Sequence, residues 1–363
     1  MILLPIVLLL GVFAVGVIVG RAGDDGGVSR PGADCSGKAA DQEKSRPPQP
    51  VVRFAPVVFL HPQEPYKPMS VECFLANAHL YWARRKGSIP TTGDKLVDAS
   101  HLGQGQYQQS AVGGACLRAQ CIFSSKEFTR PWDESRRTLL GRPGFYLDVE
   151  DPFRAGAETT LPGAIFTGTP AYYDYVPRRY VTYWFFYGFS EPFGALRLPR
   201  QAKIVGHEGD WERISIRLNR ANEATKIFYS AHHGGKPYNL PSLAIATVDD
   251  HPVVFSALKS HASYATQGRK GDLDRAAPGY LWLTWQSLED VRCAPWFGFG
   301  GAWGIPRKVP SSIRALAEQR HISLSEAEFT GPLGPSSYKR PAPKDWMGKP
   351  NPARCNHGGR SAT

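Results

Sequence analysis

The stretch "RRYVTYWFFYGF", Arg178 to Phe189, decides the fold. Behind its two arginines it is short, almost wholly apolar and strongly aromatic, which is the pattern of a strand buried on both faces in the middle of a sheet. Further short apolar runs follow, with turn residues between them: "WERISIRL", "TKIFYSAHH", "HPVVFSALKSHASYA" and "GYLWLTW". Such spacing is typical of an antiparallel sandwich or barrel. We therefore expect a mainly β protein, an antiparallel β-sandwich with a few flanking helices and long loops.

Composition supports one large core, built from short strands that are joined by many turns. The chain has 363 residues, of which 42% are hydrophobic, and its 37 glycines and 31 prolines are scattered between the apolar runs. The segment "VVRFAPVVFLHPQEPY" predicts a first strand followed by a proline-bounded turn. Two helices are expected, from about Met69 to Arg84 and from Ser311 to His321.

The N-terminal segment Ile2 to Gly20 is uncharged throughout. As a helix it would be about 28 Å long, close to the thickness of a bilayer. Residues 1–21 therefore indicate a hydrophobic signal or anchor segment, whose cleavage and orientation stay open. We expect a flexible linker at 22–50, a single sandwich domain at 51–335 and an extended basic tail at 336–363.

Six cysteines accompany this segment: Cys35, Cys73, Cys116, Cys121, Cys293 and Cys355. An even count in a chain that begins with an export-like segment favours disulfides, which persist in oxidising compartments. The pairing stays open, and Cys73 also fits a buried free thiol. We expect a protein that is membrane-anchored at the cell surface or secreted.

The net charge of +11 comes from 43 basic and 32 acidic residues. The basic residues occur in pairs rather than in a long run, so an anionic membrane lipid or an acidic glycan is a possible partner and no nucleic acid is expected. The oligomeric state stays open. Common catalytic motifs are absent from the sequence: GxSxG, HExxH and a phosphate-binding glycine-rich loop.

A second decisive stretch is "GHEGDWERISIRL", Gly206 to Leu218. In a strand, Asp210 and Glu212 share a face with Ile214, so two carboxylates point toward the core. Buried carboxylates are costly unless a cation or hydrogen-bond donors compensate them. We predict a divalent cation held by His207, Asp210 and Glu212, because the flanking glycines let the backbone bring the imidazole of His207 beside Asp210.

Other side chains near the strand ends are expected to line the same pocket: Glu191, Glu208, Trp211, His232, His233, His261 and Tyr264. Among these, Trp211 and Tyr264 are more typical of packing, and Glu208 of a solvent-facing position. A carboxylate-rich set completed by water suits Mg²⁺ or Ca²⁺, whereas added imidazole ligands suit Mn²⁺ or Zn²⁺. The alternative is structural: Asp210 or Glu212 pairs with an arginine, and the histidines are hydrogen-bonded core residues.

The motifs resemble the vacuolar protein sorting-associated protein 62 family. They occur in that family's order: "YWFFYGF", "GHEGDWERISI", "HHGG", "VVFSALKSHASYA", "FGGAWG" and "GPLGP". The opening "FAPVVFLHPQEPYKPMSVECFL" also resembles the start of that family. The resemblance extends from about Val51 to Pro335.

A more distant likeness concerns "GHEGDWE", which is similar to the GHRHDWE heptapeptide of necrosis- and ethylene-inducing-like (NPP1-type) proteins, secreted β-sandwich cytolysins. This resemblance implies that His207, Asp210 and Glu212 help to hold a divalent cation that engages sphingolipid headgroups. The heptapeptide's second histidine is Gly209 here, and the family's upstream aspartate falls near Ser190, next to Glu191. These departures leave the cytolytic activity and the remainder of the cation site open.

The function expected from the sequence is a cation-dependent binding module for a glycan, a lipid headgroup or another anionic ligand, rather than an enzyme. One alternative is a metal-dependent hydrolase of a phosphoester or glycoside, in which the cation activates water. A second alternative is a structural protein with a salt-bridged strand end.

Overall fold

The computed structural model divides the chain into two compact units, Met1–Gly32 and Ala33–Thr363. The described residues all belong to the second unit: 46–83, 102, 144–149, 154, 156, 165–166, 168–191, 206–232, 234–271, 274–297, 299, 301–305, 311–319, 331–332 and 334–335. The apolar segment 2–20 and the basic tail lie outside them. Among the described residues there is no helix of the length and apolarity that crossing a membrane requires.

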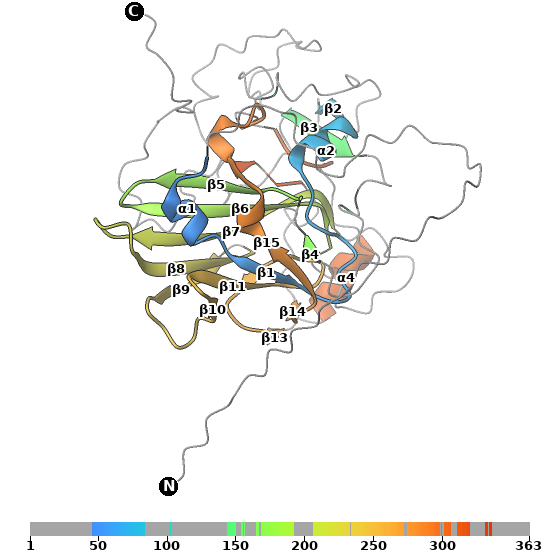
Figure 1. The fold of residues 1–363 in the computed structure, drawn as a ribbon. Coiled ribbons are helices and arrows are strands. Elements are labelled where there is room, and N and C mark those ends of the chain that lie inside the picture. The colour runs from blue at the N-terminus through green and yellow to red at the C-terminus, as the bar shows by residue number, and fades with distance from the viewer. Residues whose placement is uncertain are drawn as a thin grey trace, which may run out of the picture. The chain divides into compact units, whose positions relative to one another are not determined.

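One of the two six-stranded sheets, called sheet B here, contains the stretch that opened the sequence analysis (Figure 1). Its antiparallel strands are, in spatial order, β5 (Ala171–Val176), β6 (Tyr180–Ser190), β7 (His207–Leu218), β8 (Ala224–Ala231) and β9 (Gly234–Asn239). The short strand β16 (Leu288–Asp290) runs parallel to β5 at the edge. Every residue of β6 is buried, which confirms the prediction of a central strand covered on both faces.

The second ladder, sheet A, combines segments that are far apart in the sequence. Its order is β10 (Thr247–Val248), β11 (His251–Ser256), β1 (Val57–Leu60), β15 (Tyr280–Leu283) and β4 (Ile165–Phe166), with β12 (Ser263–Tyr264) beside β11. Two small ladders pair β13 (Gly268–Lys270) with β14 (Asp274–Ala276) and β2 (Ala78–Ala83) with β3 (Gly144–Val149). The predicted mainly β sandwich is confirmed. The sheets are mixed, because most neighbouring strands are antiparallel and three pairs run parallel: β1–β11, β15–β4 and β16–β5.

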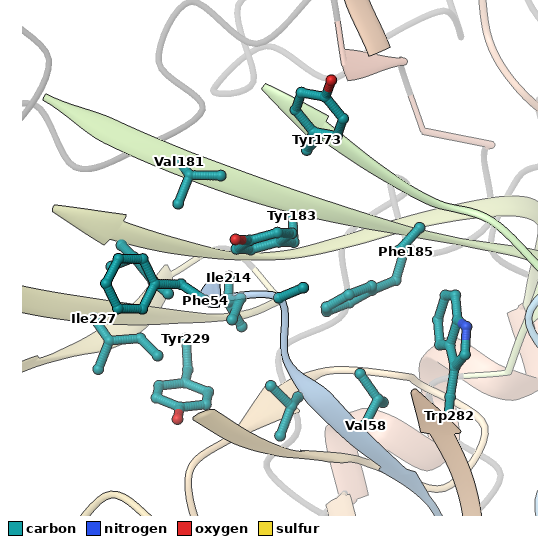
Figure 2. Packing of buried hydrophobic residues seen from close by; sticks show 14 of the residues in the cluster. Phe54, Val58, Tyr173, Val181, Tyr183, Phe185, Ile214, Ile227, Tyr229 and Trp282 are labelled. Atoms are coloured by element: carbon teal, nitrogen blue, oxygen red, sulfur yellow. The ribbon is translucent and has the colours of Figure 1, made fainter. Parts of the chain in front are cut away.

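One core fills the space between sheets A and B (Figure 2). Alternate residues of the central strands point into it, among them Tyr183 and Phe185 of β6 and Ile214 of β7. Sheet A contributes Val58 and Trp282 from the opposite side. The period-2 pattern of the sequence therefore determines which side chains enter this core.

A second, aromatic core covers the other face of sheet B. It contains Trp184, Phe186 and Trp211 from the sheet, and Trp296 and Trp303 from later in the chain. Trp211 is 3% exposed, so the expectation that it is a packing residue is confirmed. Because both faces of β6 and β7 are covered, a charged side chain on these strands needs a partner inside the protein.

The helices within the described ranges are short: α1 (Gln49–Arg53), α2 (Val71–Ala76), α4 (Ser311–Gln319) and the 3-10 turns η4 (Thr284–Gln286) and η5 (Val291–Cys293). The helix predicted from Ser311 is confirmed. The helix predicted from Met69 to Arg84 is wrong beyond Ala76, because the following residues pair with β3 as a strand. Among the described cysteines, Cys73 and Cys293, neither is a free thiol, and the pairing of the six cysteines stays a prediction.

Candidate functional site

The site lies where β7 begins, and its two carboxylates point as the alternation predicted. Asp210 and Glu212 are 6% and 8% exposed. Ile214 lies in the core between the sheets, whereas Trp211 lies in the aromatic core on the opposite face. Two acidic groups are thus held on the buried face of a central strand, where water cannot compensate their charge.

The positive partner next to Asp210 is His261, which is fully buried. Its Nδ1 lies 2.9 Å from Asp210 Oδ2, and its Nε2 lies 3.4 Å from Glu64 Oε1. Tyr187 of β6 stacks on the imidazole with the ring centroids 3.8 Å apart. Burial alone would lower the pKa of His261, but Glu64 and Asp210 outweigh it and raise the pKa to about 10. His261 is therefore an imidazolium at neutral pH.

Glu64 belongs to this cluster although sequence reasoning missed it. It is 2% exposed, and its carboxylate accepts hydrogen bonds from the backbone N–H groups of Tyr66, at 2.9 Å, and Lys259, at 2.5 Å. The Nζ of Lys67 donates to the Glu64 carbonyl oxygen. The sequence shows only a carboxylate in a proline-bounded turn, a pattern that usually indicates solvent exposure.

The turn that carries His261 has an unusual backbone. Lys259 and His261 both have left-handed φ values, 66° and 54°. The turn is closed by hydrogen bonds between Ala257 and its partners Ala262 and His261, both at 3.0 Å. Left-handed residues other than glycine cost energy and persist where their surroundings hold them. Here Glu64 holds the backbone of Lys259, and Asp210 holds the ring of His261.

Glu212 has the least compensated charge of the cluster. Burial and then the neighbouring Asp210 raise the pKa of its carboxyl well above the usual range. Its Oε2 is buried with no hydrogen-bond partner among the described residues, and Nε2 of His261 has only the 3.4 Å ion-pair contact with Glu64 there. The cluster formed by Glu64, Asp210, Glu212 and His261, called the acid–imidazole cluster below, therefore contains three carboxyl groups and one imidazolium.

Asp274, a carboxylate outside the acid–imidazole cluster, contacts two of the other predicted side chains, His232 and Tyr264. It accepts hydrogen bonds from His232 Nε2 at 2.7 Å, Ser260 Oγ at 2.6 Å and Tyr264 OH at 2.5 Å. Burial works to raise the pKa of Asp274, but these partners lower it overall. His232 and Tyr264 thus converge on a carboxylate that the sequence analysis did not single out, and Asp274 in turn contributes to the raised pKa of Glu212.

The remaining predicted residues have separate positions. Nδ1 of the half-buried His207 lies 3.0 Å from the carbonyl oxygen of Gly209. Glu191 pairs with Lys259 Nζ at 2.6 Å and accepts a hydrogen bond from the Tyr66 hydroxyl at 3.3 Å. His233 lies outside the described residues.

The solvent-facing position expected for Glu208 is wrong. Glu208 is 2% exposed and forms an ion pair with Arg154, which compensates its burial. Across the described ranges, no group of three or more His, Cys, Asp or Glu side chains is arranged to hold a metal ion. The ligand set His207, Asp210 and Glu212 therefore stays a prediction.

Gly209 gives a direct test of the local backbone. Its φ is 56°, and a Cβ at this position would lie 2.3 Å from the carbonyl oxygen of Trp303. We expect Gly209→Ala to lower the free energy of unfolding by at least about 2 kcal/mol, because a left-handed alanine costs about 1–2 kcal/mol before the contact with Trp303 is counted. Urea denaturation measures the change.

The matched control is Gly234→Ala, at an exposed position with no atom within 4 Å of the added Cβ. Its effect should stay within about 0.5 kcal/mol. Equal stability of the two variants would contradict the close approach of β7 to Trp303.

Comparison with known proteins gives the following similarities. Residues 179–272 match the family model described as vacuolar protein sorting-associated protein 62. The chain is 23% identical to vacuolar protein sorting-associated protein 62 of Saccharomyces cerevisiae over 332 residues, which is 81% of this chain and 66% of that relative. The chain thus spans just under two thirds of the relative's length. The resemblance predicted from the motifs is confirmed, and Asp210, Glu212 and His261 lie inside the matched range.

Among solved structures, the chain is similar to necrosis and ethylene inducing protein 2 from the causal agent of cocoa's witches' broom disease. The identity is 14%, the TM-score is 0.27, and the match covers 69% of this chain and 81% of that one. A second similar structure is NLPPya in complex with glucosamine, with 14% identity, a TM-score of 0.24 and coverage of 40% of this chain and 65% of that one.

Proposed function

We propose that this chain, which resembles the vacuolar protein sorting-associated protein 62 family over residues 179–272, is a β-sandwich binding module in which a divalent cation helps to capture a surface ligand. Asp210 and Glu212 would hold the cation, with His207 as a third ligand. The captured ligand is a glycan or a lipid headgroup, whose shared chemistry is a set of oxygen atoms that complete the coordination. The apolar segment 2–20 and the even cysteine count support a location at the cell surface or in the secreted fraction.

The observation that carries this proposal is the buried Oε2 of Glu212, for which the described part of the chain supplies no hydrogen-bond donor. Asp210 and Asp274 both add to the electrostatic cost of ionising Glu212, and the positive charges of Arg213 and His261 reduce that cost without cancelling it. A buried carboxylate in this position is stabilised by a cation, and carboxylate oxygens are the ligands that Mg²⁺ and Ca²⁺ prefer. When bound, the cation would supply positive charge and open coordination positions for the ligand's oxygens.

His207 has the tautomer that a third ligand requires. Its Nδ1 lies beside the carbonyl oxygen of Gly209, which can only accept a hydrogen bond, so Nδ1 carries the proton. Nε2 then keeps its lone pair, and this arrangement is common for histidines that bind metals. An imidazole ligand would extend the choice of cation to Mn²⁺ or Zn²⁺.

A second candidate is structural, and one observation favours it. His261 lies 2.9 Å from Asp210 and already supplies positive charge to the strand end. In that case the acid–imidazole cluster fixes the turn at Lys259 and His261 to β7 and binds no cation. The two candidates differ in metal content.

The test is the metal content of the full chain after dialysis against Mg²⁺, Ca²⁺, Mn²⁺ or Zn²⁺ in turn. Wild-type protein should retain a stoichiometric amount of one of them. Asp210→Asn should reduce retention at least about tenfold, because it removes a charged ligand without changing the shape of the side chain. The control Asp249→Asn, at an exposed turn position, should bind as the wild type does. A wild-type protein free of metal would leave only the structural candidate.

Ligand capture is tested separately, with immobilised glycans and with vesicles that contain glycosphingolipids, each with and without a chelator. Retention that the chelator abolishes supports the binding module. Turnover of a phosphoester or glycoside without lasting retention would contradict it and favour the metal-dependent hydrolase.

A further inference from the structure

The end of sheet B opposite the acid–imidazole cluster carries a basic surface. Two turns meet there, the β5–β6 turn with Arg178 and the β7–β8 turn with Arg220 (Figure 1). The backbone N–H of Arg178 donates to Asn222 Oδ1 at 2.8 Å, which links the two turns. Both arginines are exposed, so their guanidinium groups face solvent from adjoining turns.

Two more basic side chains extend this surface onto the strands. Arg217 of β7 lies directly opposite Lys226 of β8 in the ladder, so the two share one face of the sheet. Both are half-buried. Like charges directly opposite each other destabilise a sheet unless something compensates them. We call Arg178, Arg217, Arg220 and Lys226 the basic end of sheet B.

Ion-pair partners for these four side chains are missing from the part of the chain that the structure describes. Among the described residues, none of these four side chains forms an ion pair, whereas Arg154, Lys259 and Arg292 each have a carboxylate partner. The nearby Glu223 accepts a hydrogen bond from Asn219 at 2.8 Å. Asn219 is a neutral donor, so Glu223 keeps its negative charge, and four cations beside this carboxylate leave the basic end with a net positive charge.

An apolar side chain lies within this basic group. Phe228 of β8 packs, half-buried, against Val176 and Tyr180. Clustered cations around an apolar ring suit the headgroup region of a membrane, where mobile anionic lipids can pair with each cation in turn. A rigid anion would have to match the spacing of all four cations at once.

We propose that the basic end of sheet B docks the protein on an anionic lipid surface. This inference is independent of the cation site, which lies at the other end of the same sheet. Glu212 and Arg217 are five residues apart in β7, so the nearest members of the two groups are roughly 17 Å apart. A molecule docked in this way holds the acid–imidazole cluster away from the membrane that it sits on.

The test compares binding of the full chain to phosphatidylcholine vesicles and to vesicles that also contain phosphatidylserine. Binding by the apolar segment 2–20 contributes to both measurements. The difference in binding between the two kinds of vesicle therefore gives the electrostatic contribution alone. The wild type should prefer the anionic vesicles, and 0.5 M salt, an ionic strength at which the Debye length falls to about 4 Å, should remove that preference. Arg178→Glu combined with Arg220→Glu should reduce the preference at least about tenfold, since each basic residue near a lipid surface contributes about 1 kcal/mol.

The matched control reverses the same amount of charge elsewhere. Arg269→Glu combined with Arg275→Glu changes two exposed arginines that face each other across β13 and β14. This control should keep most of the preference for anionic vesicles. Equal losses in both double variants would overturn the proposal, because net charge alone would then explain binding.

Two further outcomes are decisive. A variant at the basic end that keeps its preference for phosphatidylserine but loses binding to heparin or to a DNA duplex would contradict a lipid partner. Metal content is measured on the same samples, and the basic-end variant should keep the wild-type value. Loss of vesicle binding with unchanged metal content therefore separates this docking surface from the cation proposal.

Discussion

Replacing His261 with glutamine is expected to lower the free energy of unfolding by roughly 3–5 kcal/mol at pH 7 in the presence of a chelator. Removing one partner of a buried ion pair leaves the other charge uncompensated, which costs about this much. In this protein Asp210 and Glu64 would both lose the imidazolium between them. Urea denaturation followed by tryptophan fluorescence measures the change.

A second histidine provides the control for this substitution. His251 is half-buried, donates from Nδ1 to the carbonyl oxygen of Ala55 at 2.7 Å, and stacks on Trp285. His251→Gln should cost about 1 kcal/mol, the usual contribution of one hydrogen bond. A loss in His261→Gln no larger than in His251→Gln would show that Asp210 and Glu64 do not depend on the imidazolium.

The stability difference between wild type and His261→Gln should also depend on pH in a defined direction. The pKa of His261 is raised from 6.5 to about 10 in the folded protein. A raised pKa means that the folded state binds the proton more tightly, so the stabilisation is complete below pH 6.5 and is lost as the pH rises to about 10. The two proteins should therefore converge in stability at alkaline pH. A difference that grows with pH would contradict a protonated His261.

The sequence could predict the parts of the site that local alternation determines. Asp210 and Glu212 face the core because side chains in a strand alternate, and β6 is buried because its apolar run has no polar face. His261 was expected near Asp210 because both follow or open strands, and their side chains do meet. The first two inferences depend on residues within one short segment, whereas the third joins two strand ends that are distant in sequence.

The partners that arrive from other segments could not be predicted. β1 and β11 are parallel neighbours, so the turn after β1, with Glu64, lies beside the turn after β11, with His261. The sequence suggested antiparallel pairing throughout, which would place these two ends at opposite edges. The role of Asp274 could not be predicted for the same reason, because its partners His232 and Ser260 come from different parts of the chain.

Local preference also failed where tertiary pairing overrode it. The segment "SVECFLANAHLYW" shows apolar residues at helical spacing, yet the helix ends at Ala76 and the rest forms β2. Pairing with β3 decides this, and β3 lies far along the chain. A helix pattern in a short window cannot reveal a strand partner that is so distant in sequence.

The aromatic core predicts the other large effect on stability. Trp211 is 3% exposed and lies with its ring centroid 4.6 Å from that of Phe186 and 5.4 Å from those of Trp296 and Trp303. Trp211→Ala should cost roughly 3–5 kcal/mol, the usual cost of truncating a buried tryptophan, measured as a lower urea midpoint with an unchanged m-value. Trp285→Ala, at a half-buried position outside this core, should cost clearly less.

A conservative substitution separates packing from polar chemistry at the same position. The indole N–H of Trp211 is buried and finds no hydrogen-bond acceptor among the described residues, so it contributes nothing that phenylalanine would lose. Trp211→Phe should therefore keep most of the stability that Trp211→Ala loses. Because Trp211 lies between Asp210 and Glu212 in β7, its packing also fixes the strand that carries both carboxylates. Equal losses for Phe and Ala would mean that the indole N–H, rather than the aromatic packing, holds this face of the sheet.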